Sequence, residues 1–276
     1  MATEDSISDY QEKTLEDMLF AITSPLYVNN TSDMTGSGFF YFESPKRNTK
    51  EKKKKYEDIW LVTNSHVLFG TDVTGPDRLS EIRFRTRRKT LSGSPSWNRL
   101  VICGEDLKGR IRLSHDANED VAVVKVTDEI EKVHPDIDQG YGFFAVSDIL
   151  FPDKSSAFVE VGDDVIVVGY PRGIYDEENL FPIVRSSCIA TRWGAHVNGF
   201  RYFLLDRKHH PGSSGSIVIT KPTVIESSIT KQFLFLGIYE GELYRNKTPT
   251  DTSKVWYGSL VKEIVNNGKT WVQANP

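Results

Sequence analysis

Cysteine is scarce in this sequence, since only Cys103 and Cys188 occur among 276 residues, in separate halves of the chain. A secreted protein of this size often carries more cysteines, arranged in disulfide pairs. The two residues are therefore predicted to be buried free thiols in a reducing compartment, which favours a cytoplasmic protein. Residues 1–18 are acidic and polar, which is wrong for a secretory signal.

Long apolar runs and an excess of positive charge are also absent. No run approaches the roughly 18 apolar residues that a membrane-spanning helix needs, so no membrane contact is predicted. Lys and Arg number 34 against 38 Asp and Glu, and the net charge of −4 argues against a nucleic-acid partner. With 38% hydrophobic residues, the chain can bury the core of one large domain or of two small ones.

One stretch of the sequence resembles a calcium site at its start, but the residues that follow exclude it. Residues 116–120, DANED, have the first spacing of a calcium-binding loop. Val121 stands where that loop needs glycine, and no glutamate follows at the closing position. No metal and no other cofactor is therefore expected.

Short apolar runs separated by Gly, Pro, Asn and Asp dominate the chain after Ser24-Pro25. Helical periodicity is confined to residues 9–22 and to residues 259–265. The apolar stripe of the first segment could pack on the chain itself, join an oligomer or dock on another protein. Many short strands with no helices between them predict an all-β sandwich or barrel. The strand-like runs are residues 39–42, 59–63, 82–85, 99–103, 121–126, 164–170, 201–205, 216–220 and 233–239.

Two basic features allow a functional or a structural interpretation. Residues 44–58 hold seven basic side chains between two predicted strands, which favours a long solvated loop over a contact with an acidic partner. In the strand-like run IRFRTRRK, the alternation sends Arg83, Arg85 and Arg87 to one face. That face is predicted to be the solvent-exposed side of a strand.

The stretch RKHHPGSSGSIVI, residues 207–219, is either a flexible serine-glycine linker or a tight turn that exposes a serine hydroxyl. The strand-like run that follows favours the turn. Gly212 allows a positive φ, and in such a turn the N–H groups of Gly212 and Ser214 can converge on one point as an oxyanion hole.

A serine hydroxyl becomes a nucleophile only when a base removes its proton and a carboxylate orients that base. His66 follows the strand-like run WLVT, and Asp120 directly precedes the apolar run VAVVKV, so both lie at strand ends. Taken alone, His66 would be a buried structural histidine, and Asp120 would cap a turn. The chain order His66, Asp120, Ser214 and the missing glycine at Ser216 exclude the α/β-hydrolase arrangement.

Four ordered motifs resemble those of chymotrypsin-fold, trypsin-like serine proteases, and among them the HtrA/Deg-type branch. VTNSHV (62–67) is similar to the histidine motif and EDVAVVKV (119–126) to the aspartate motif. VEVGDDVIVVGYPRG (159–173) resembles the segment that opens the second barrel, and DRKHHPGSSGSIVI (206–219) resembles the nucleophile motif. The likeness extends over about residues 24–265.

The resemblance implies two six-stranded antiparallel β-barrels, and the helical periodicity described above adds a short N-terminal and a short C-terminal helix. The expected divisions are an N-terminal helical segment (1–23), a first barrel (24–148), a linker (149–157), and a second barrel with the C-terminal helix (158–276). Because the chain ends soon after the second barrel, it is expected to lack the PDZ module that this branch often carries.

The same resemblance implies a role for each candidate site residue. His66 becomes the general base, Asp120 its orienting partner and Ser214 the nucleophile, while the N–H groups of Gly212 and Ser214 form the oxyanion hole. If Lys208 faces the substrate pocket, the pocket would favour a substrate with an acidic side chain. If Glu240 faces it, the pocket would favour a basic side chain, and the sequence leaves that choice open. The residues expected to wall the pocket are Lys208, His209, His210, Pro211, Tyr239 and Glu240.

Two departures from the family pattern lie beside the nucleophile, and the first of them affects the expected regulation. Ser213 replaces the aspartate that pairs with a newly cut N-terminus in trypsin-like zymogens, so that mode of activation is not expected. Ser216-Ile217 replaces the usual Gly-Pro pair without touching a catalytic atom.

The sequence thus predicts an intracellular serine endopeptidase that acts on polypeptides. It is expected to be latent until a protein partner or homo-oligomerisation activates it. The alternative is a catalytically silent module of protease fold that binds a peptide or a partner, and an esterase with the same triad is a minor third hypothesis.

Overall fold

The computed structural model describes most of the chain between residues 15 and 271. The start of the predicted N-terminal helix, nearly all of the basic loop 44–58, most of the linker 149–157, and Lys208 lie outside the described residues. The described residues are 15–42, 58–70, 79–88, 96–107, 109–135, 137, 145–147, 150–152, 159–171, 174–176, 178–207, 209–224 and 231–271.

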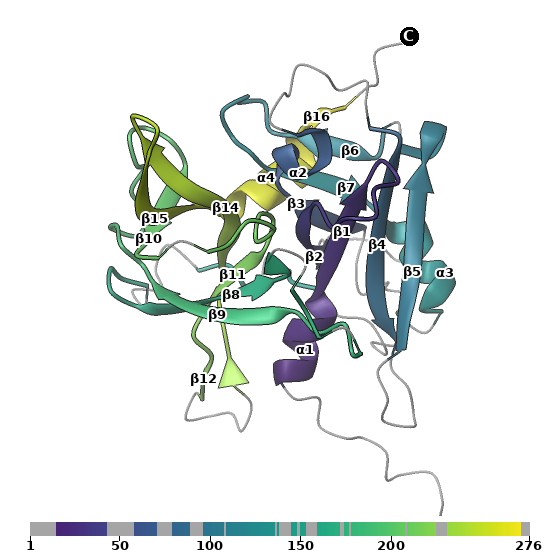
Figure 1. The fold of residues 1–276 in the computed structure, drawn as a ribbon, viewed down its shortest axis with the longest axis horizontal. Coiled ribbons are helices and arrows are strands. Elements are labelled where there is room, and N and C mark those ends of the chain that lie inside the picture. The colour runs from purple at the N-terminus through teal and green to yellow at the C-terminus, as the bar shows by residue number, and fades with distance from the viewer. Residues whose placement is uncertain are drawn as a thin grey trace, which may run out of the picture.

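Strands form two main antiparallel sheets that lie side by side (Figure 1). The first has the order β16-β6-β7-β3-β2-β1-β4-β5, and the second has the order β10-β15-β14-β11-β8-β9. The first sheet comprises β1 (Thr23–Val28), β2 (Gly36–Phe42), β3 (Ile59–Thr63), β4 (Glu81–Arg88), β5 (Ser96–Cys103), β6 (Ile111–Leu113), β7 (Ala122–Lys125) and β16 (Lys269–Thr270). The second comprises β8 (Asp164–Gly169), β9 (Ile183–Cys188), β10 (Tyr202–Leu205), β11 (Ile217–Thr220), β14 (Phe235–Arg245) and β15 (Thr248–Tyr257). A separate pair is formed by β12 (Thr223–Val224) and β13 (Lys231–Gln232).

The predicted all-β fold with two antiparallel β bodies is confirmed, and the arrangement is that of a chymotrypsin-like double barrel. Each of the nine apolar runs coincides with a strand. The first sheet has eight strands rather than six, because the short β6 folds back on β7 and β16 pairs with β6. In the second sheet a bridge between Ile189 and Leu205 joins the ends of β9 and β10, the two edge strands.

Four α-helices and one short 3-10 turn (Gly104–Leu107) accompany the strands in the described residues. The predicted terminal helices are present as α1 (Leu15–Ile22) and α4 (Ser259–Asn267), while α2 (Ser65–Phe69) and α3 (Thr127–Val133) were not predicted because they are too short to show helical periodicity. Leu19 and Ile22 of α1 lie in the core, so this part of the helix packs on its own chain. Within the described residues, no helix is both long and apolar enough to cross a bilayer.

Alternate residues of the central strands face two different cores. Phe40 of β2 and Leu61 of β3 belong to a cluster within the first sheet. Their neighbours Phe39 and Val62 belong to a second cluster, which also contains residues of the other sheet and of α4. Because both faces of these strands are buried, they read as continuous apolar runs rather than as an alternating pattern.

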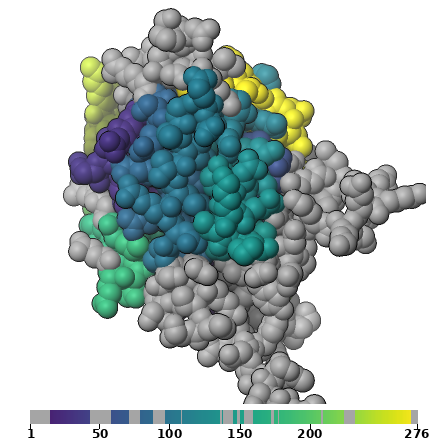
Figure 2. Space-filling model, turned by 90° about the vertical axis from the view of Figure 1, so that its right-hand side faces the viewer, coloured from purple at the N-terminus to yellow at the C-terminus, as the bar shows by residue number. Residues whose placement is uncertain are grey.

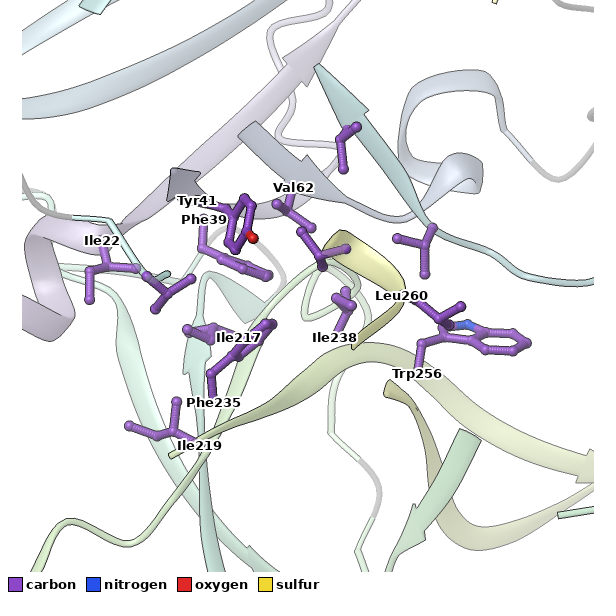
Figure 3. Close-up of a cluster of buried hydrophobic side chains, with 14 of the residues drawn as sticks. Ile22, Phe39, Tyr41, Val62, Ile217, Ile219, Phe235, Ile238, Trp256 and Leu260 are labelled. Atoms are coloured by element: carbon purple, nitrogen blue, oxygen red, sulfur yellow. The ribbon is translucent and has the colours of Figure 1, made fainter. Parts of the chain in front are cut away.

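The cluster between the sheets holds them together (Figure 3). Phe39 and Val62 approach it from the first sheet and Ile217 and Phe235 from the second, and Leu260 of α4 lies next to Trp256 in Figure 3. The rings of Phe39 and Phe235 meet edge to face with centroids 5.2 Å apart. A third cluster fills the second sheet and includes Tyr239. The two sheets are therefore held in one relative position by a largely apolar contact.

Figure 2 shows the side of the molecule covered by β4, β5 and α3. The predicted alternation along β4 is confirmed, since Phe84 and its even-numbered neighbours are buried and the arginines lie on the other face. That face is half-buried rather than fully exposed, which corrects the prediction. The guanidinium groups of Arg83 and Arg85 lie over the ring of Tyr27, at 5.5 and 6.0 Å from its centroid, and Arg87 pairs with Asp17 at 3.0 Å.

Both cysteines are free thiols, as predicted, but the prediction that they are buried is wrong. Cys103 is exposed and Cys188 is half-buried. Cys103 follows Ile102, which points into the core, so the alternation of β5 turns the Cys103 side chain outward.

Candidate active site

The pairing of β3 with β7 brings His66 and Asp120 together across a long stretch of sequence. Thr63, the last residue of β3, lies opposite Ala122, the first residue of β7. The two strands are antiparallel, so the segment leaving β3 and the segment entering β7 meet at one edge of the sheet. His66 lies just beyond β3 on α2, and Asp120 lies just before β7.

Asp120 holds the imidazole of His66 in one orientation. Its Oδ2 accepts a very short hydrogen bond from Nδ1 of His66, and its Oδ1 accepts the backbone N–H of His66 at 2.9 Å. A carboxylate can only accept, so Nδ1 carries the proton and Nε2 keeps its lone pair. Burial lowers the pKa of His66, but the hydrogen bond and charge of Asp120 and the charge of Glu240 outweigh it, so the pKa is raised.

The segment around Asp120 is anchored on both sides. The buried Asn64 donates from Nδ2 to the backbone carbonyl of Asp120 at 2.6 Å. The carboxylate of the preceding Glu119, which is 5% exposed, accepts two hydrogen bonds from the Arg201 guanidinium. Arg201 also binds Glu263 of α4, so one guanidinium ties the Asp120 segment to that helix. Such bidentate charge-assisted contacts fix geometry well.

A tight turn precedes Ser214, and it excludes the linker interpretation. The N–H of Ser213 donates to the carbonyl of His210 at 3.2 Å, so His210 and Ser213 close a four-residue turn. Pro211 and Gly212 occupy its central positions, and Gly212 has φ of +87°. Proline followed by a residue with positive φ is the pattern of a type II turn, which explains why glycine stands there.

A second turn of the same pattern contains Ser214 itself. The N–H of Ser216 donates to the carbonyl of Ser213 at 2.9 Å, and Gly215 between them has φ of +83°. A Cβ on Gly215 would lie 2.0 Å from the carbonyl oxygen of Ser37 and 2.4 Å from Oγ1 of Thr63. Gly215 is therefore required by its φ and by the close approach of the first sheet.

Ser37, which sequence reasoning missed, joins this double turn to the first sheet. Its backbone N–H donates to the carbonyl of Ser214 at 2.8 Å, and its hydroxyl donates to the carbonyl of Gly212 at 2.9 Å. The same hydroxyl oxygen accepts the N–H of Tyr170 at 2.9 Å. The signal in the sequence is Gly36-Ser37-Gly38, since glycines inside a strand mark a close backbone approach.

The backbone N–H groups of Gly212 and Ser214 have no acceptor among the described residues. They are separated by Ser213, whose own N–H is used in the first turn. Two neighbouring free donors beside a serine hydroxyl can stabilise an anionic oxygen.

The Ser214 hydroxyl itself donates to the backbone carbonyl of Glu240 at 2.8 Å. In the described part of the chain it makes no hydrogen bond with His66. Ser214 nevertheless lies beside α2, because a Cβ on Gly36 would meet both Val67 and the carbonyl oxygen of Ser214, at 2.7 and 3.1 Å. The structure thus brings the three candidate residues to one place and directs the hydroxyl to Glu240.

The described residues of the predicted substrate pocket differ strongly in exposure. His210 and Pro211 are exposed, whereas His209 and Tyr239 are buried, with the His209 N–H donating to Oη of Tyr239 at 2.9 Å. Both ring nitrogens of His209 lack hydrogen-bond partners within the part of the chain that is described. Burial, followed by the charges of neighbouring cationic groups, lowers its pKa to about 4.

No group of three or more His, Cys, Asp and Glu side chains among the described residues could hold a metal ion. In the discarded calcium loop, the Asp116 carboxylate accepts hydrogen bonds from the backbone and side chain of Asn118, both at 2.9 Å. These bonds lower the pKa of Asp116. The Asp116 carboxylate therefore stabilises the local turn in which it lies.

The chain matches the family of the trypsin-like peptidase domain over residues 36–223, which include His66, Asp120 and Ser214. Among solved structures it is similar to the HtrA-type protease AlgW with tripeptide, with 15% identity and a TM-score of 0.45, covering 90% of this chain and 60% of that one. The same protease with decapeptide gives 13% identity and a TM-score of 0.43, covering 90% and 66%. The chain thus spans about 60% of the first of these structures. No curated protein matches it.

Gly215→Ala should destabilise the fold much more than Gly194→Ala. Both residues have positive φ, but nothing lies within 4 Å of a Cβ at Gly194. We expect a loss of about 1 kcal/mol in the free energy of unfolding at Gly194 and of about 3 kcal/mol at Gly215, measured by denaturant titration. Equal losses at the two sites would contradict the close approach of Ser37.

The buried His209 should make stability depend on pH. Because its folded pKa is about 4, below the usual 6.5, its contribution is complete above pH 6.5 and is lost as pH falls toward 4. The unfolded chain binds the proton in this window and the folded chain does not, so stability falls by at most about 1.4 kcal/mol per pH unit.

His209→Phe keeps an aromatic ring against Tyr239 and should flatten this dependence, measured as unfolding free energy between pH 7 and pH 4. His210→Phe is the matched control at an exposed position and should leave the slope unchanged. A His209→Phe slope equal to that of the unmodified protein would show that His209 is not the group responsible.

Proposed function

The chain belongs to the trypsin-like peptidase family, and from this premise we propose that it is a serine endopeptidase that cleaves polypeptides through an acyl-enzyme on Ser214. The observation that carries the proposal is the His66–Asp120 hydrogen bond beside the turn that presents Ser214. A half-buried carboxylate, a histidine with a free Nε2 and a serine hydroxyl are the groups that acyl transfer requires.

In the proposed reaction, Nε2 of His66 takes the proton of the Ser214 hydroxyl as Oγ attacks the substrate carbonyl. Asp120 keeps the imidazole in the required tautomer and stabilises the imidazolium that forms. The free N–H groups of Gly212 and Ser214 bind the oxyanion. The imidazolium then protonates the leaving amine, and water hydrolyses the acyl-enzyme by the same steps.

Latency remains part of the proposal. In the resting state the Glu240 carbonyl holds the Ser214 hydroxyl, so the serine must rotate before His66 can take its proton. No acceptor among the described residues occupies the N–H groups of Gly212 and Ser214. We therefore place the activating step at this rotation, driven by substrate, by a protein partner or by a second copy of the chain.

The same bond to Glu240 favours the second candidate, a peptide-binding module that does not turn over. A module of this kind would keep the hydroxyl on Glu240 when peptide binds. The two candidates differ in whether His66 ever activates Ser214, and a covalent serine probe detects this directly.

The primary pocket is proposed to lie along residues 208–211 and Tyr239. The Glu240 carboxylate is paired with Lys254, so it is not free to select a basic substrate side chain. We assign the charge preference of the pocket to Lys208, which favours an acidic side chain. The unpaired thiols of Cys103 and Cys188 support a reducing, cytoplasmic location.

A fluorophosphonate probe should label the unmodified protein and neither Ser214→Ala nor His66→Ala. Asp120→Asn should retain the fold and lower the labelling rate by a factor on the order of 10⁴, because the imidazole loses its tautomer and orientation. Ser213→Ala is the control, since Ser213 is buried, and it should still be labelled. Absence of labelling in the unmodified protein, with and without peptide, would favour the binding module.

The pocket assignment predicts cleavage after Glu or Asp in preference to Lys or Arg. Matched peptides that differ only at the residue before the scissile bond measure this preference as a ratio of kcat/KM, with ester analogues alongside to test for an esterase. Lys208→Gln should reduce the preference at least tenfold, and Lys221→Gln, at an exposed lysine, should not. An unchanged ratio in Lys208→Gln would refute the assignment.

A further inference from the structure

Glu240 is a charged residue at the centre of the site that has no role in the reaction as proposed. Along β14 the side chain of Tyr239 points into the core of the second sheet, where it contacts His209 and Ser253. The strand has a β-bulge between Tyr239 and Gly241, so Glu240 does not follow the regular alternation of side chains. Its charge acts on both His66 and Asp120, and its carbonyl holds the Ser214 hydroxyl.

The side chain of Glu240 is 17% exposed, and its carboxylate is bound on one side only. Its Oε1 forms an ion pair with Nζ of Lys254, which β15 places opposite Gly241. Its Oε2 is buried and has no hydrogen-bond partner among the described residues. A buried carboxylate oxygen without a partner is costly, so a nearby positive charge that appears during the reaction would be strongly favoured.

We propose that Glu240, kept ionised by Lys254, is a positioning residue that acts through His66 as a second carboxylate, stabilising the imidazolium formed when His66 takes the proton of Ser214. The inference rests on the proposed triad. Lys254, Glu240, His66 and Asp120 then form a sequence of alternating charges, positive, negative, positive, negative. When His66 is neutral, the carboxylates of Glu240 and Asp120 share Lys254 as the one cation of this set.

The surrounding charges support this assignment. Burial, together with the charge of Asp120, raises the pKa of Glu240, and Lys254 opposes that rise. The charge of Glu240 adds to that of Asp120 in raising the pKa of His66, and Lys254 acts in the opposite sense as a smaller contribution. The charged groups that face Glu240 are therefore Lys254 from β15, His66 from α2 and Asp120 from the segment before β7.

Lys254 is itself held in place. Its Nζ lies 5.8 Å from the ring centroid of Tyr202 on β10, and its side chain is 22% exposed. A cation between a carboxylate and an aromatic face is well stabilised. The partner of Glu240 is thus held by two neighbouring strands and is not a freely moving surface lysine.

The test is an NMR titration of the His66 ring in the full chain, with the signal assigned from His66→Ala. Glu240→Gln keeps the backbone carbonyl and the side-chain shape and removes the charge. It should lower the pKa of His66 by about 1 unit, because a nearby negative charge that favoured the imidazolium is lost. Glu242→Gln, on the same strand, is the matched control and should leave the pKa unchanged.

A double variant covers the case in which Glu240→Gln leaves Lys254 without a partner and fails to fold. Glu240→Gln with Lys254→Met removes both charges and should lower the pKa of His66 in the same direction by a smaller amount. A purely structural Glu240–Lys254 pair would lower the Tm and leave the titration of His66 unchanged, and this result would overturn the proposal.

The pH dependence of fluorophosphonate labelling provides a second readout. Labelling requires neutral His66, so its acid limb should move to lower pH in Glu240→Gln by the same amount as the NMR titration. Because NMR reads the ring without catalysis, a shifted titration in a protein that is never labelled would count against the proposed function alone. An unshifted titration in a protein that is labelled would count against the role of Glu240 alone.

Discussion

The apolar contact between the two sheets is the constraint on which the candidate site depends. His66 and Asp120 belong to segments of the first sheet, whereas Ser214 belongs to the second. Their alignment therefore requires the sheets to hold one relative position. The buried side chains of β2 and β3 meet those of β11 and β14 in a largely apolar cluster. Close packing of this kind resists small displacements, since each shift opens a cavity or forces an overlap.

Backbone contacts turn this general docking into a specific geometry. Ser37 reaches across the boundary with both its N–H and its hydroxyl, and the carbonyls of Ser214 and Gly212 accept these bonds. The close approach is permitted only because Gly215 has no side chain. The shape of the nucleophile turn thus depends on a residue of the other sheet, which links the integrity of the fold to the position of the free N–H groups.

Electrostatics around the imidazole follow from the same docking. Asp120 reaches His66 through strand pairing inside the first sheet, and the charge of Glu240 acts on it from the second. Two carboxylates from different sheets thus act on one imidazole, and Lys254 keeps the second of them charged. The arrangement favours the protonated form of His66, and it places the carbonyl of Glu240 where it binds the Ser214 hydroxyl.

The sequence by itself determined the strands with continuous apolar runs, such as β3 and β7, and the candidate set His66, Asp120 and Ser214, because apolar runs and turn residues act locally. It did not reveal β1, which contains Pro25, or β15, whose first half is polar. Only the tertiary structure decided that Ser37 supports the turn, that Arg201 anchors the segment of Asp120, and that Glu240 pairs with Lys254. Each of these contacts joins residues far apart in sequence, so it depends on strand register and sheet docking, which no local pattern encodes.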